Sequence, residues 1–311
     1  MDQTNYFDKN YDLISSYINL TKGRKVYIGT KEDRVCRFCD RSSPDVDFKN
    51  IAHAIPEFTG NKSLVAYDEC DVCNEKFSRT IEDHLAKYLG AQRTLAQVHG
   101  KKGVPTYVGK DGKTRISMKE YGISLTSYEE NPIYEIDEEK KSIKITAHRQ
   151  PYIPAAVFKC LVKMAISVAP KQDLSSLKHL ITWIGLEAHT YESLPYRPLI
   201  VFEQFTPGPM PYSGVTIFLL RRKGAVNDVP YMQFVIAFAN TMFQIVLPML
   251  NEDSEIMGKP IQLTLFPIPF SKDYKYGNTS TKKLDMSSFE TIRNEEQILY
   301  MGYESLEKNP P

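Results

Sequence analysis

The sequence predicts an α+β protein in which a small cysteine-stapled module precedes a larger α+β domain with a mostly antiparallel sheet. Four of the five cysteines form two CxxC pairs near the start of the chain, and such pairs staple small modules around a metal ion. From residue 151 onward, two helical segments come first and apolar strand-like runs follow. That order is typical of α+β domains with an antiparallel sheet.

The composition is that of an ordinary globular protein. Of 311 residues, 42% are hydrophobic and 25% are charged, and the formal net charge is +1. The net charge therefore does not indicate a polyanionic partner, and any basic surface must be local. No apolar run approaches the roughly 18 residues that span a bilayer. We expect no membrane association and a cytoplasmic location, since the chain opens without an apolar signal segment.

The chain divides into four segments by composition. We expect a lead-in over 1–33 with a helix in YDLISSYINL, a cysteine-rich module over 34–92, a basic and then acidic connecting segment over 93–150, and an α+β regulatory, sensor or partner-binding domain over 151–311. The connecting segment ends in a predicted strand, SIKITAH.

The last segment carries the strongest secondary-structure patterns. Predicted helices are AAVFKCLVKMAISVA and LSSLKHLITWIGLEA, and predicted strands are RPLIVFEQF, GVTIFLLRRK and IQLTLFPI. The run YMQFVIAFANTMFQIV fits one long strand, two strands or a helix equally well.

Within the cysteine-rich module, the pattern predicts strand, loop, strand and helix. VDFKNIAHAI alternates apolar and polar positions as a half-buried strand does, and Pro56 ends it. SLVAY is a second candidate strand, and apolar residues recur at spacings of three and four from Phe77 to Leu89.

The two cysteine pairs are Cys36 with Cys39 and Cys70 with Cys73. Four thiolates from two such knuckles form the closed tetrahedral site that structural zinc favours. The alternatives are two disulfides, which the expected reducing compartment disfavours, or unrelated buried thiols. The fifth cysteine, Cys160, is interpreted as a small buried hydrophobe.

His53 lies between the two cysteine pairs, three residues before Pro56. A histidine held at a strand end can take a proton from water because its pKa is near neutral. Phosphodiester hydrolysis needs such a base together with a divalent cation. Asn74 begins the predicted helix on the same face as Ile81 and Leu85, so this end of the helix should lie near the histidine loop.

The run CRFC…FKNIAHAIPEFTGNKSL…ECDVCNEKFSRTIEDHL resembles the HNH endonucleases, in the zinc-containing branch with a treble-clef-like ββα-metal core. The resemblance covers residues 34–90. It implies metal-dependent cleavage of DNA, with a structural Zn²⁺, a catalytic Mg²⁺ or Mn²⁺, and His53 as general base. It further implies that Asn61 orients the base through a backbone contact and that Asn74 binds the catalytic metal.

One position departs from the family pattern. Ala52 stands where many members carry an acid that binds the metal. We therefore expect help from Glu57 or Glu82, and Glu82 is better placed than His84 by helical angle. The competing interpretations are a core role for His53, a turn role for Asn61 and a helix cap at Asn74.

A basic, glycine-rich stretch follows the module, and GKDGK within it is typical of a hairpin turn. Beside a nuclease module such a stretch could contact nucleic acid, although a solvated loop is the alternative. The candidate contacts are Lys101, Lys102, Lys110, Lys113 and Arg115.

Two functions remain open from the sequence. The first is an HNH-type DNA endonuclease controlled by its C-terminal domain, similar to effectors of bacterial anti-phage defence that respond to an activating ligand or partner protein. The second is a non-catalytic zinc module that binds nucleic acid or a partner protein. An RNA-directed nuclease would differ from the first function only in its substrate. The sequence also leaves a homo-oligomeric state open.

Overall fold

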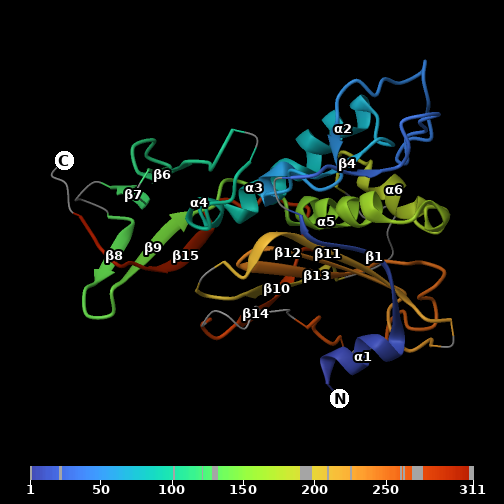
Figure 1. Ribbon diagram of the computed structural model, residues 1–311. Coiled ribbons are helices and arrows are strands. Elements are labelled where there is room, and N and C mark those ends of the chain that lie inside the picture. The colour runs from blue at the N-terminus through green and yellow to red at the C-terminus, as the bar shows by residue number, and fades with distance from the viewer. Residues whose placement is uncertain are drawn as a thin grey trace.

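The computed structural model describes residues 2–20, 23–100, 102–120, 122–127, 132–189, 198–208, 210–224, 226–259, 261, 263–267 and 276–307. Figure 1 shows the cysteine-rich module on one side of two central helices, α5 (Pro154–Val168) and α6 (Lys178–Ile184), and the largest sheet on the other side. Among the described residues, no helix is long and apolar enough to cross a membrane.

The largest sheet has six strands in the order β1 (Tyr11–Leu20), β11 (Tyr212–Arg222), β12 (Met232–Ala239), β13 (Thr241–Leu247), β10 (Ile200–Phe205) and β14 (Ser280–Asp285). All neighbouring strands are antiparallel. The expected α+β class with a mostly antiparallel sheet is confirmed. The long apolar run forms two strands, β12 and β13, because the chain reverses at Asn240.

The predicted helix in YDLISSYINL is wrong, because these residues form the edge strand β1. The helix α1 (Gln3–Asn10) lies just before it. Ile14 and Tyr17 pack on the main core, whereas Leu13 and Ile18 are exposed. The spacing of Ile14 and Tyr17 also fits a helix. The segment is a strand because it pairs with β11, about 200 residues away in the sequence.

The predicted strand IQLTLFPI is also wrong for its described residues, 261 and 263–267, which carry no strand assignment. The neighbouring strand β13 already pairs on both sides, with β12 and β10. The segment instead binds a side chain: Gln244 Nε2 donates to Thr264 O (3.0 Å), and Phe266 N donates to Gln244 Oε1 (2.8 Å).

Two smaller sheets extend to one side of the molecule (Figure 1). One contains β8 (Tyr134–Asp137), β9 (Ser142–His148) and β15 (Glu296–Gly302), and the other contains β5 (Tyr107–Val108), β6 (Arg115–Lys119) and β7 (Gly122–Thr126). The predicted strand SIKITAH is confirmed as β9. Because β15 pairs with β9, the C-terminal part of the chain returns to the segment that follows the module.

The module has the expected order of elements, with shorter strands than predicted. It contains β3 (Ala52–His53), the 3-10 turn η1 (Glu57–Thr59), β4 (Leu64–Ala66), α2 (Asp71–Phe77), the π-helical turn η2 (Ser78–Glu82) and α3 (Asp83–Leu89). Strand β2 (Val26–Ile28), from the lead-in, pairs in parallel with β4. A short helix, α4 (Gln92–Leu95), follows.

Helix α5 is buried along its whole length and contacts η2 and α3 of the module as well as strand β12. Its Lys163 is fully buried, with Nζ 3.0 Å from Glu69 Oε2 and 3.3 Å from Glu82 Oε1. Burial alone would lower the pKa of Lys163, but the two carboxylates raise it above its usual range. Lys163 is therefore a buried cation that joins α5 to the module.

The C-terminal end of α5 is held by Arg37, the residue after the first zinc-knuckle cysteine. Arg37 Nη1 donates to the carbonyl oxygens of Ile166 (2.6 Å), Ser167 (2.9 Å) and Ala169 (3.2 Å). Its Nε and Nη2 donate to Asp68 Oδ2, at 3.1 and 2.6 Å. A cation at these carbonyls also suits the negative end of the helix dipole.

Replacing Lys163 with Met should destabilise the protein by about 3 kcal/mol, because two carboxylates would lose their buried cation. The free energy of unfolding in urea measures this change. Lys178→Met is the matched control, since Lys178 forms an exposed ion pair with Asp40 and should cost about 1 kcal/mol or less. Equal losses in the two variants would contradict a structural role for the buried cation.

Candidate active site and metal centre

The four predicted zinc ligands come together in the structure. The Sγ atoms of Cys36, Cys39, Cys70 and Cys73 all lie within 4.8 Å of one another. The Cys39–Cys70 Sγ separation is 3.8 Å, and a tetrahedron with Zn–S bonds of about 2.3 Å has edges of about that length. All four thiols are free of disulfides. The cluster is a candidate structural zinc site.

The electrostatics of the four thiols also favour a cation. A hydrogen bond from Cys73 is the first cause that lowers the pKa of Cys36, to about 5. Burial raises the pKa of Cys70 to about 11, and the interaction with Cys36 raises that of Cys73. Ionisation of one thiol therefore raises the pKa of the others, and a bound cation would favour the thiolate form of all of them.

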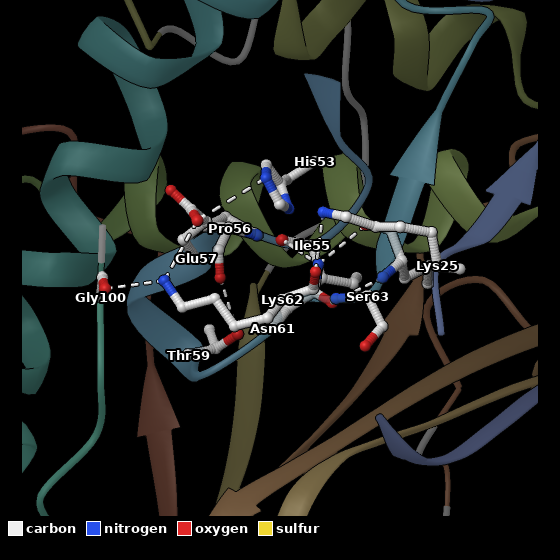
Figure 2. A network of polar contacts seen from close by, with 11 residues as sticks. Lys25, His53, Ile55, Pro56, Glu57, Thr59, Asn61, Lys62, Ser63 and Gly100 are labelled. Carbon is white, nitrogen blue, oxygen red and sulfur yellow. Dashed lines mark hydrogen bonds and ion pairs between the residues drawn. The ribbon is translucent and has the colours of Figure 1, made fainter. Parts of the chain in front are cut away.

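His53 ends strand β3 and pairs with Val65 of β4. Its side chain is 21% exposed, and Nε2 lies 3.7 Å from Glu57 Oε1 (Figure 2). Nδ1 is buried and has no hydrogen-bond partner within the part of the chain that the structure describes. The interpretation of His53 as a satisfied core histidine therefore does not fit its surroundings.

The pKa of His53 is lowered from its usual value. Burial is the largest cause, and Lys25, Lys62 and Lys163 act in the same direction, whereas Glu57 opposes them. A lowered pKa keeps the imidazole neutral at neutral pH, which is the form that accepts a proton.

The side chain of Asn61 forms hydrogen bonds across the loop between β3 and β4 (Figure 2). The side chain is fully buried. Its Nδ2 donates to Ile55 O (2.7 Å) and Leu64 O (2.9 Å), and its Oδ1 accepts from the N–H groups of Ser63 (3.1 Å) and Leu64 (2.9 Å). The amide thus bonds both sides of the loop that follows His53, which holds the strand end in place.

A chain of polar contacts runs from His53 to the basic stretch. Lys62 Nζ lies 3.1 Å from Glu57 Oε1 and donates to Gly100 O (2.7 Å). Lys25 Nζ donates to the carbonyl of Lys62 (2.9 Å). Sequence reasoning missed both lysines; the position of Lys62 directly after Asn61 was a signal for one, and no local signal pointed to the other.

The remaining candidate ligands have different surroundings. Asn74 is half-buried in the first turn of α2, and its N–H donates to Cys70 O. Glu82 is paired with Lys163, as described above. His84 Nδ1 accepts the N–H of Ile153 (3.0 Å), so this ring joins α3 to the start of α5. Burial lowers the pKa of His84.

The predicted hairpin turn in GKDGK is confirmed between β5 and β6. Asp111 Oδ1 accepts from the N–H groups of Lys113 and Thr114, at 3.0 and 2.9 Å. Lys110, Lys113 and Arg115 are exposed along this hairpin. Lys102 is exposed in the preceding loop, and Lys101 lies outside the described residues.

Comparison with known proteins gives one match. Residues 36–89 match the family model described as HNH endonuclease. The match covers the cysteine cluster, the His53 loop and helices α2 and α3, so the resemblance inferred from the CxxC and histidine motifs is confirmed for this segment. Comparisons with curated proteins and with solved structures found no match.

Replacing Cys70 with Ala should remove bound zinc, because three thiols cannot close the tetrahedral site, and should destabilise the module. Elemental analysis of the purified protein should give one zinc per chain for the wild type and for the control Cys160→Ala, since Cys160 lies in α5 outside the cluster. Zinc retained in full by Cys70→Ala would contradict the assignment.

Proposed function

We propose that the protein is a metal-dependent HNH endonuclease that hydrolyses DNA phosphodiester bonds with His53 as general base. The observation that carries the proposal is the position of His53 inside a segment that matches this family, with a partly exposed side chain and a lowered pKa. The match itself supports nuclease activity in general; the DNA substrate and the role of each residue are part of the proposal.

In this mechanism the neutral imidazole of His53 takes a proton from the attacking water at Nε2, since Nδ1 is buried. Asn61 acts as a positioning residue, because its amide bonds the backbone of the loop after His53. Glu57 stabilises the imidazolium that forms, since its carboxylate lies 3.7 Å from Nε2. Lys62 keeps Glu57 in place by contacting the same carboxylate oxygen.

The family also implies a catalytic Mg²⁺ or Mn²⁺, which would stabilise charge on the phosphoryl oxygens and on the leaving 3′ oxygen. Carboxylate and amide oxygens suit these cations. Glu57 and Asn74 are the candidates to hold one, and Glu57 would then share its carboxylate between the cation and its half-exposed contact with Lys62. Glu82 is a weaker candidate than the sequence suggested, because binding a cation would compete with its buried ion pair to Lys163.

We assign DNA contacts to the β5–β6 hairpin and the loop before it, through Lys102, Lys110, Lys113 and Arg115, with Lys101 as a further sequence-based candidate. The support is their exposure and the bond from Lys62 to Gly100 O, which ties the start of this stretch to the His53 loop. Exposed cations on this stretch would contact the phosphates of a polyanionic strand.

We further propose that residues 34–92 form the nuclease module and that the domain over 151–311 controls it, in the cytoplasm, as an effector of anti-phage defence. The buried contacts of α5 with the module support control through packing. Strand β1, from the first segment, completes the sheet of this controlling domain.

A second function is favoured by one observation. Ala52 supplies no acid beside His53, and Glu82 is already paired. A module that binds nucleic acid through its zinc-stapled fold without cutting would fit these facts. Cleavage assays on plasmid, linear duplex, single-stranded DNA and RNA, with Mg²⁺, Mn²⁺ or EDTA, separate the two functions.

His53→Ala should lower the cleavage rate by about 100-fold or more, because a general base contributes roughly that much. His148→Ala, on strand β9 outside the module, is the matched control and should cut at the wild-type rate. Metal-dependent cutting that persists in His53→Ala would exclude His53 as the base.

The cleavage rate should fall on acidification, with a midpoint below the ordinary histidine pKa of about 6.5, because the pKa of His53 is lowered and only its neutral form accepts a proton. Lys62→Met removes one of the charges that lower this pKa, so its midpoint should move to higher pH. A pH–rate profile of both proteins measures the shift, and a movement to lower pH would contradict the assignment.

Arg115→Ala should weaken DNA binding and reduce the slope of log K against log salt concentration by about one, because one phosphate contact is lost. Fluorescence anisotropy with a labelled duplex at several salt concentrations measures the slope. Lys140→Ala, in the exposed turn between β8 and β9, is the control. An unchanged slope in Arg115→Ala would remove the hairpin from the interface.

A further inference from the structure

A cavity of about 580 Å³ lies beside the six-stranded sheet, and its described lining includes no residue of the cysteine cluster or of the His53 loop. Ile200 and Phe202 of β10 and Val246 of β13 line it. They alternate with Val201 and Ile245, which are buried in the main core. These three side chains are therefore on the face of their strands that points away from Val201 and Ile245.

The rest of the wall comes from the segment after β13 and from α5. Ile256 and Leu263 lie on this segment, and Phe158 lies on α5. Close-packed interiors leave few voids larger than a water molecule, whereas pockets of roughly 300–1,000 Å³ hold drug-sized ligands. The size of the cavity fits a small organic molecule.

The charge of the cavity has one sign. Lys259 and Lys283 are its charged lining residues, and none of the described lining residues is acidic. Lys283 stands directly opposite Phe202 in the β10–β14 register. Both lysines are exposed and neither forms an ion pair with a described residue. Within the described lining, the charged groups at this apolar wall are thus both cations.

We propose that this cavity binds a small organic anion, whose apolar body packs against Phe202, Val246 and Leu263 and whose acidic group contacts Lys259 and Lys283. An acidic group on the ligand would pair with the two ammonium groups, and burial of its apolar body against the apolar walls is favourable. The site is separate from the His53 loop, and its existence does not depend on nuclease activity.

The walls of the cavity are directly connected to the nuclease module. Glu203, the residue after Phe202, accepts a buried hydrogen bond from Tyr88 Oη of α3 (2.8 Å). Phe158 lies on the same helix as Lys163, which pairs with Glu69 and Glu82 of the module. A ligand against Phe202 and Phe158 therefore touches β10 and α5, the two elements that contact the module. Its binding should change the stability of these contacts.

The chain contains one tryptophan, which makes the test direct. Trp183 is fully buried, and its ring centroid lies 6.3 Å from that of Phe158. The probe is 8-anilinonaphthalene-1-sulfonate, an aromatic body with one anionic group. We expect binding of one probe per chain, with a change in Trp183 emission. The matched neutral probe is N-phenyl-1-naphthylamine, which lacks the sulfonate and should bind more weakly.

Lysine variants decide whether the proposed groups hold the anion. The double variant Lys259→Ala/Lys283→Ala should bind the sulfonate probe about tenfold more weakly and the neutral probe unchanged. Lys282→Ala, an exposed neighbour on β14 outside the cavity lining, should bind both probes as the wild type does. Equal affinity of the double variant and the wild type for the sulfonate probe would overturn the proposal.

Hydrogen exchange locates the probe without reference to cleavage. Saturation with the sulfonate probe should slow exchange in 200–205 and 256–263, and in 83–89 if occupancy reaches the module through Tyr88. Protection confined to other parts of the chain would overturn the site. Protection of the cavity walls with no change in 83–89 would keep the site and exclude its connection to the module.

Discussion

The burial of Lys163 between Glu69 and Glu82 is the constraint on which the arrangement of the molecule depends. An apolar helix could pack on the module in several rotations, but a buried cation tolerates only the one that meets its carboxylates. Arg37 adds a second fixed point at the C-terminal end of α5. Because α5 also packs on the six-stranded sheet, these charges set the orientation of the module relative to that sheet.

The metal centre and this interface share the same short segments of chain. Arg37 follows Cys36, and Glu69 precedes Cys70. In each knuckle, a candidate zinc ligand is therefore adjacent in sequence to a charged residue that contacts α5. Closing the thiol cluster therefore also places Arg37 and Glu69 against α5. A metal ion bound at this candidate site would therefore stabilise docking of the module as well as its fold.

The electrostatics of the candidate active site follow from its position in this assembly. Burial is the largest cause that lowers the pKa of His53, and Lys25, Lys62 and Lys163 act in the same direction, while Glu57 opposes them. Under the proposed function, Lys25 and Lys62, which reach solvent, would also attract a phosphate backbone. The charges that help to keep the proposed base neutral would then favour its polyanionic substrate as well.

The sequence alone determined the parts of the protein that depend on short spacings. Local patterns predict the CxxC pairs, the loop from His53 to Asn61 and the helix after Cys73. Their geometry depends on residues that are close in sequence. Tertiary structure decided what depends on distant partners. Strand β1 exists because β11 pairs with it, and Glu82 faces Lys163 of α5. The local periodicity of the sequence predicts neither β11 as the partner of β1 nor Lys163 as the partner of Glu82. The stabilising contacts join residues that are far apart in the sequence and form only when the chain has folded.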